Sequence, residues 1–153
     1  IVDEGLDKYS AQFKVKYIPG TLNAVGVDAG IEREECTLTT SGIPVEIDVK
    51  ADRPILQDTK NDLSYVRIEL VDKEGNIVSD QDCKVELSIS GKGRILSAGN
   101  ACPTDMESFR SLSPMTYKGR ALAILQPKGG KGCIRLTVKT EKYGKKTITI
   151  NVE

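Results

Sequence analysis

Acidic side chains are the first candidates for chemistry in this sequence, which contains 22 Asp and Glu residues but no His. The absence of His excludes Ser-His-Asp and Cys-His nucleophile systems and His-ligated zinc or iron. Glu34 and Glu35 are neighbours on an expected strand and must point to opposite faces, so they cannot act as a pair. Asp80 and Asp82 share a face and could bind calcium, but calcium takes about six oxygen ligands, and solvated surface acids are the favoured interpretation. The sequence therefore predicts no catalytic residue and no metal ligand.

The four cysteines are the second candidates: Cys36, Cys83, Cys102 and Cys133. Their spacings of 47, 19 and 31 residues match no CxxC metal pattern and no catalytic signature. Three disulfide connectivities stay open, and the Cys-Trp-Cys pattern of antibody domains cannot occur because the chain has no Trp. We expect four free thiols.

Two glycine-rich segments, residues 91–93 and 129–132, could be taken for phosphate-binding loops. Neither is followed by a helical pattern, so the helix dipole that makes such loops bind anions is missing. We therefore expect hairpin turns at both places and no bound cofactor.

Composition and charge restrict the class of protein. Ile, Val and Thr number 37 against 20 for Leu plus Ala, which favours strands over helices. The net charge is zero, but residues 1–90 hold 18 acids and 10 bases, whereas residues 118–153 hold 9 bases and 2 acids. The bases of the last segment alternate with apolar residues, which indicates a solvated strand face rather than a nucleic-acid or membrane surface. No apolar run is long enough to span a membrane.

Alternation of apolar and polar residues with period two predicts the elements that must position any site. It is clear around Val45–Val49, Val66–Leu70, Val85–Ile89, Ile134–Val138 and Ile148–Val152. A further strand around Leu122 and Ile124 ends at Pro127, and glycine-rich turns separate the strands. Nowhere does an apolar stripe of period 3.6 persist. These features predict an all-β fold, an immunoglobulin-like β-sandwich.

One long segment, from Gly99 to Gly119, carries Pro103 and Pro114 and no sustained alternation. Loops of this length in compact domains are usually functional or lie at an interface. Its candidate interdomain or ligand-contact residues are Asn100, Thr104, Glu107, Phe109 and Tyr117. The alternative is that Phe109, Met115 and Tyr117 form a small cluster that only holds the loop against the sandwich.

Residues 1–42 are expected to be the trailing strands of a truncated immunoglobulin-like domain, a partial second sandwich, and residues 43–153 a complete C-terminal one. The segment Thr40-Ser41-Gly42-Ile43-Pro44 is the natural linker. The chain starts at Ile1 with no visible signal peptide, which suggests a fragment. Its unpaired strand edges could cause self-association.

The order of motifs resembles the C-terminal immunoglobulin-like domains of bacterial β-galactosidases of glycoside hydrolase family 2. The resemblance covers nearly the whole chain from Phe13, and it rests on the segments at residues 17–26, 39–44, 51–55, 62–66, 72–78, 90–95 and 118–124. In the long loop the family pattern Asn-Gly-Asp-Pro-Thr becomes Asn100-Ala101-Cys102-Pro103-Thr104, with Glu107 and Phe109 following.

The resemblance implies a carbohydrate-hydrolysing parent enzyme, periplasmic or extracellular in a bacterium. A retaining glycosidase needs two carboxylates about 5 Å apart, and in this family both belong to a barrel that lies upstream. The chain is therefore expected to be a non-catalytic accessory region whose partners are the upstream domains, with no nucleic acid and no membrane. Two alternatives are a carbohydrate- or partner-binding immunoglobulin-like module and an adhesin-type repeat.

Overall fold

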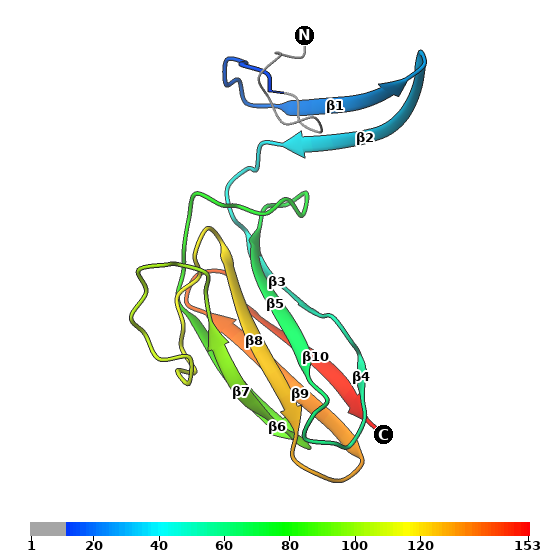
Figure 1. The fold of residues 1–153 in the computed structure, drawn as a ribbon. Coiled ribbons are helices and arrows are strands. Elements are labelled where there is room, and N and C mark those ends of the chain that lie inside the picture. The colour runs from blue at the N-terminus through cyan, green and yellow to red at the C-terminus, as the bar shows by residue number, and fades with distance from the viewer. Residues whose placement is uncertain (1–11) are drawn as a thin grey trace. The chain divides into compact units, whose positions relative to one another are not determined.

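The computed structural model describes residues 12–153, and the first 11 residues of the expected trailing unit lie outside that part of the chain. The chain divides into two compact units between Thr40 and Ser41. Within residues 12–153 the secondary structure is entirely β (Figure 1). These residues contain no helix long and apolar enough to cross a membrane.

The described part of the first unit, residues 12–40, contains one antiparallel hairpin, β1 (Thr21–Asp28) and β2 (Ile31–Thr39). Ala29 and Gly30 connect the strands with φ angles of 49° and 80°, as a tight two-residue hairpin turn requires. Every residue of both strands is exposed. Two strands cannot bury a core of their own, so this hairpin has the surface of an incomplete sheet.

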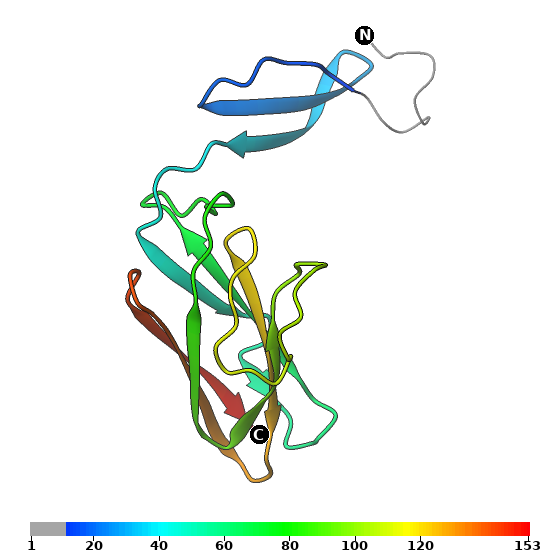
Figure 2. The same ribbon diagram turned by 90° about the vertical axis from the view of Figure 1, so that its left-hand side faces the viewer.

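The second unit is a β-sandwich of two four-stranded sheets, whose layers are visible in Figure 2. The first sheet has the order β4-β10-β9-β6 and the second β3-β5-β8-β7. Their bounds are β3 (Glu46–Ala51), β4 (Ile55–Leu56), β5 (Ser64–Val71), β6 (Val85–Gly91), β7 (Gly93–Gly99), β8 (Arg120–Pro127), β9 (Gly132–Thr140) and β10 (Lys145–Val152). The expected all-β sandwich is confirmed.

The core lies between the sheets and is built from the apolar positions of the alternating strands. Side chains that are fully shielded from solvent include Val66, Ile68, Leu125, Ile134 and Leu136. Their polar neighbours along each strand face outward, as the period of two predicts.

Both glycine-rich segments expected to be hairpin turns cross between the sheets instead. Residues 91–93 connect β6 to β7, and residues 128–131 connect β8 to β9, and in each case the two strands belong to different sheets. The backbone N–H of Lys128 donates to the Lys92 carbonyl, so the two crossings lie together at one end of the sandwich. The prediction of hairpins was wrong because alternation within single strands does not reveal which strands pair.

The second half of the long loop is part of the sandwich. Backbone N–H groups of Val85 and Leu87 donate to the carbonyls of Pro114 and Leu112, and the Thr116 N–H donates to the Cys83 carbonyl. β6 is the last strand of its sheet, so residues 112–116 cover an edge that would otherwise expose unpaired backbone groups. Pro114 fits there because only its carbonyl is needed.

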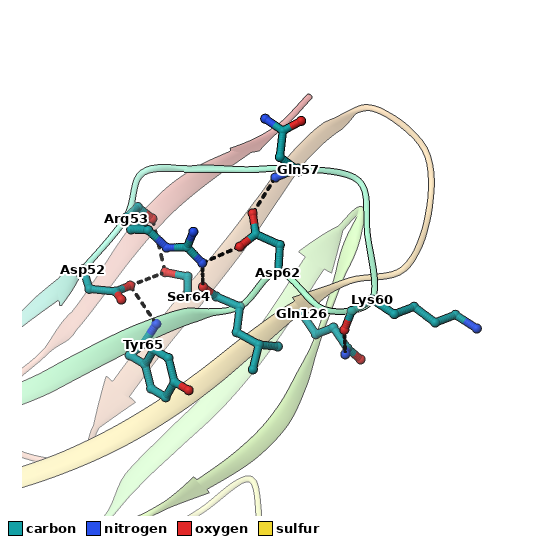
Figure 3. A network of polar contacts seen from close by, with 9 residues as sticks. Asp52, Arg53, Gln57, Lys60, Asp62, Ser64, Tyr65 and Gln126 are labelled. Atoms are coloured by element: carbon teal, nitrogen blue, oxygen red, sulfur yellow. Dashed lines mark hydrogen bonds and ion pairs between the residues drawn. The ribbon is translucent and has the colours of Figure 1, made fainter.

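The irregular connection between β3 and β5 is fixed by a polar network (Figure 3). Arg53 binds the Asp62 carboxylate and the Leu63 carbonyl, and Asp52 accepts hydrogen bonds from the Ser64 hydroxyl and the Tyr65 N–H. These bonds tie the segments on either side of β4 to the start of β5.

The expected linker is attached to the second unit. Asp72 is buried, and its carboxylate accepts hydrogen bonds from the N–H groups of Gly42, Glu74 and Asn76. These donors, with Gly42 contributing most, lower the pKa of Asp72. Gly42 is therefore attached to the Asp72 turn of the second unit.

Asp48 on β3 should make the stability of the sandwich depend on pH. Its carboxylate accepts from Lys146 at 2.8 Å and pairs with Lys50 at 2.7 Å, which lowers its pKa to about 2. Because the pKa of Asp48 is lower in the folded than in the unfolded chain, its ionised carboxylate stabilises the fold at pH values above about 4. This stabilisation is lost as the pH falls from about 4 to about 2.

We expect Asp48→Asn to remove this part of the pH dependence and to cost about 1 kcal/mol at pH 7, since the lysines are partly exposed and solvent screens the pair. Urea denaturation between pH 2 and pH 7 measures it. Glu141→Gln is the control, because Glu141 makes no ion pair within residues 12–153. Parallel stability curves for wild type and Asp48→Asn would contradict the assignment.

Candidate functional site

The outer face of the β3-β5-β8-β7 sheet carries the candidate site. Strand register brings Arg67 of β5 opposite Leu122 of β8, and Leu122 opposite Gly99 of β7. One row away, Glu69 lies opposite Arg120. These residues come from three strands that are distant in sequence, and each is an outward position of its own strand.

A hollow of about 350 Å³ lies over these strands. Leu122, Ile124 and the backbone of Gly99 form an apolar floor, and Phe109 of the long loop forms a wall. A side chain at Gly99 would meet the Phe109 ring, since an added Cβ would lie 2.7 Å from its Cδ1 atom. The lack of a side chain at Gly99 therefore lets the ring lie against the sheet.

The backbone holds Phe109 in place although the residue is 65% exposed. The Ala98 N–H of β7 donates to the Phe109 carbonyl at 2.8 Å. The first half of the loop is thus attached to the free edge of β7, as its second half is attached to β6.

Charged side chains surround the hollow unequally. Glu69 pairs with Arg120, with 3.5 Å between the Glu69 Oε1 and Arg120 Nε atoms. Arg67 lines the same hollow and makes no ion pair or side-chain hydrogen bond within residues 12–153. The local balance is two guanidinium groups against one carboxylate, which favours an anion.

The structure brings together some of the loop residues named from the sequence and separates others. Asn100 and Phe109 line the hollow, and Glu107 lies beside both in a smaller adjoining depression. Thr104 instead contacts the Cys102 sulfur at 3.4 Å, and Tyr117 lies under the Lys118 ammonium, 5.6 Å from it.

Asn100 acts mainly within the loop. Its amide nitrogen donates to the Asp105 carboxylate at 2.7 Å and to the Met115 carbonyl at 3.0 Å, and its oxygen accepts from the Cys102 N–H. These bonds fix the fold of the loop, so Asn100 shapes the hollow and has little capacity left for a ligand.

Sequence reasoning missed Arg67, Leu122 and Ile124. The alternation placed Arg67 outward, but it assigned no face to Leu122 and Ile124, because residues 121–125 are all apolar. The structure buries Ala121, Ala123 and Leu125 and turns Leu122 and Ile124 outward. Nothing in the sequence indicated that Phe109, which comes 13 residues before Leu122, would lie against the same face.

The acidic pair Asp80 and Asp82 does not form a cation site. One Asp82 oxygen accepts hydrogen bonds from the Gly119 N–H at 2.9 Å and the Thr116 hydroxyl at 3.1 Å, so it fixes the end of the long loop. Among residues 12–153, no group of three or more acidic, Cys or His side chains is arranged to hold a metal.

All four cysteines are free thiols in the structure; Cys36 is exposed and the other three are partly buried. Cys83 packs against the core of the sandwich. Its burial raises the pKa of the thiol, which disfavours the reactive thiolate.

Phe109→Ala should change the free energy of unfolding by less than about 1 kcal/mol, because most of the ring is exposed and little apolar area is lost. The control is Leu125→Ala, at a fully buried position of β8, which should cost about 3 kcal/mol. Urea denaturation of both variants gives the comparison. An equal loss for the two would mean that Phe109 is a structural anchor and not a contact residue.

The fold defines a class of protein: a β-sandwich module, whose outer-face hollow has Glu69 as its one lining carboxylate among residues 12–153. Residues 47–149 match the family model described as glycoside hydrolase family 2 C-terminal domain 5. The chain belongs to this family, and the resemblance noted from the sequence is confirmed.

Two curated relatives are named β-galactosidases. The chain is 31% identical over 148 residues to beta-galactosidase BoGH2A of Bacteroides ovatus, and the match covers 97% of the chain but 17% of that protein. It is 27% identical over 129 residues to a beta-galactosidase of Rhizobium radiobacter, covering 84% of the chain and 83% of that sequence. The chain thus spans about one sixth of the length of the first relative.

Solved structures agree with this assignment. A family 2 glycosyl hydrolase from Bacteroides cellulosilyticus superposes with a TM-score of 0.86 at 34% identity, covering 91% of this chain and 18% of that one. A beta-glycosidase from Bacteroides vulgatus gives the same TM-score at 23% identity, covering 94% of this chain and 19% of that one, and shows the shared fold.

Proposed function

We propose that this chain is a non-catalytic accessory region of a β-galactosidase-type family 2 enzyme, and that it packs on the rest of that enzyme and stabilises it. The single observation that carries the proposal is the hairpin of the first unit. It exposes apolar side chains on a sheet that has two strands within residues 12–40, too few for a stable sheet by themselves.

Register shows how the hairpin is divided into faces. Leu22 pairs with Leu38, and Ala24 pairs with Cys36, so these four side chains share one face. On the other face Asn23 donates to the Glu35 carboxylate at 2.6 Å. An apolar face opposite a polar one is the pattern of a sheet that buries one side against a partner.

The chemistry of the second unit supports a non-catalytic role. A glycosidase site needs two carboxylates, one acting as acid and the other as nucleophile or base. The hollow on the outer face contains one, Glu69, and its charge is already balanced by Arg120. The isolated chain should therefore not turn over a chromogenic β-galactoside, and turnover that persists after removal of contaminating enzyme would contradict this.

The decisive experiment uses the full-length enzyme. The double variant Leu22→Asp/Leu38→Asp places two charges on the apolar face, and Thr21→Asp/Thr39→Asp places two charges on the neighbouring pair, which belongs to the other face. We expect the leucine variant to lower the melting temperature of the enzyme by roughly 5 °C or more, since charge burial without a partner is costly. Equal melting temperatures for the two variants would refute packing through the apolar face.

A binding module is the second candidate function, and the hollow beside Phe109 is the observation that favours it.

A further inference from the structure

Packing through the hairpin of the first unit does not explain the hollow on the outer face of the second unit. It combines an apolar floor, an aromatic wall and an excess of positive charge. Ligand sites for small molecules have this composition: mostly apolar surface with a few polar groups that fix orientation.

Arg67 is the polar group that is free to act. Lys50 of the same sheet pairs with Asp48 at 2.7 Å, and Arg120 pairs with Glu69 at 3.5 Å. Arg67 makes no such pair in the part of the chain that the structure describes. The residue directly opposite it in the register, Lys50, is also a cation. Because Lys50 and Arg120 are each paired with a carboxylate, the excess positive charge lies on Arg67. An unpaired guanidinium favours a carboxylate, which Arg can hold with two parallel hydrogen bonds.

The apolar part of the hollow sets the size of the rest of the ligand. Leu122 lies directly opposite Arg67, and Ile124 follows it on the same face of β8. Phe109 stands at the β7 side against Gly99. A flat ring of six atoms can lie on the Leu122 and Ile124 side chains with an edge or face toward Phe109, in a volume of about 350 Å³.

We propose that this hollow binds a small molecule in which a carboxylate is attached to a six-membered ring. The carboxylate pairs with Arg67, and the ring contacts Phe109, Leu122 and Ile124. Aromatic acids and hexuronic acids share this chemistry, and they differ in whether both faces of the ring are apolar or the ring carries hydroxyl groups.

The test is a titration of the 153-residue chain followed by two-dimensional amide NMR, with benzoate and glucuronate as probes. Their neutral counterparts benzamide and glucose, and acetate as a carboxylate without a ring, are the ligand controls. We expect saturable shifts at Leu122 and Gly99 with at least one ring carboxylate and weaker binding of all three controls. Benzoate alone would identify an aromatic acid, and glucuronate alone a hexuronic acid.

Arg67→Gln should weaken the binding by roughly tenfold or more, because a charge-assisted pair is lost. Arg135→Gln on the outer face of the other sheet is the matched control and should leave binding unchanged, since Arg135 is also exposed and unpaired within residues 12–153. Phe109→Ala should weaken ring carboxylates but not acetate.

Absence of saturable shifts with both ring carboxylates would overturn the proposal and leave the hollow as a contact surface for protein. Equal affinity for acetate, or an Arg67→Gln variant that binds as well as wild type, would also overturn it. Each of these results leaves the accessory function untouched, because that function is tested on the hairpin of the first unit.

Discussion

Replacing Gly119 by alanine should destabilise the sandwich by at least about 3 kcal/mol. Gly119 has a φ of +71°, a conformation that costs an alanine about 1 to 2 kcal/mol. An added Cβ would also lie 2.1 Å from the Val78 carbonyl oxygen, which belongs to the backbone and cannot rotate away. The two penalties act together, so the chain must shift at the point where the long loop enters β8.

Several backbone hydrogen bonds depend on the position of Gly119. The Gly119 N–H donates to Asp82, and its carbonyl accepts from the Leu70 N–H at 2.8 Å. Lys118 and Gly119 form a tight turn in which the backbone groups of Tyr117 and Arg120 bond to each other. A shift there would move Arg120 and Leu122, and with them the floor of the hollow.

Gly144→Ala is the matched control. Gly144 has a similar φ of +75°, but an added Cβ would have nothing within 4 Å. It should therefore cost only the backbone term of about 1 kcal/mol. Urea denaturation of the two variants separates strain from steric conflict, and a difference below about 0.5 kcal/mol would show that the backbone at Val78 yields easily.

The second large effect concerns the state of association of the isolated chain. We expect it to form a dimer or a larger species, because the hairpin exposes Leu22 and Leu38 on one face and its strand edges have no partner strand within residues 12–153. Pairing with another copy would extend the sheet and bury the apolar face. Sizing combined with light scattering, over a range of concentrations, measures the mass.

Removal of residues 1–41 should give a monomer, because the second unit has its own core and a loop that covers the edge of β6. Leu22→Asp/Leu38→Asp should also reduce the mass, whereas Thr21→Asp/Thr39→Asp should preserve association through the apolar face. A wild-type chain that stays monomeric at high concentration would show that the first unit has too little exposed surface to drive pairing.

The sequence by itself predicted the fold class and most strands of the second unit. A half-buried strand must alternate, so Val66, Ile68 and Leu70 could be assigned to the core without knowledge of their neighbours. It missed β7, where a bulge between Ile95 and Ser97 breaks the alternation, and β4, which has two residues and pairs in parallel with β10.

The family was also accessible from the sequence, since its motifs occur in order along the chain and the family model matches residues 47–149. The long loop was correctly singled out as a segment with unusual composition. That half of it would cover the β6 edge was not accessible, because the carbonyls of Leu112 and Pro114 find their donors on a strand that precedes them by 25 residues or more.

The hollow was decided by the tertiary structure alone. Of the three residues in the central row, the alternation identified only Arg67 as outward, and the chemistry of Arg67, Leu122 and Gly99 depends on the register that brings them together. Register between strands distant in sequence is set by how the two sheets bury their apolar faces together, and by where the loop places Phe109. A local pattern fixes which face a residue occupies, but only the packing of the whole sandwich fixes which residues share that face as neighbours.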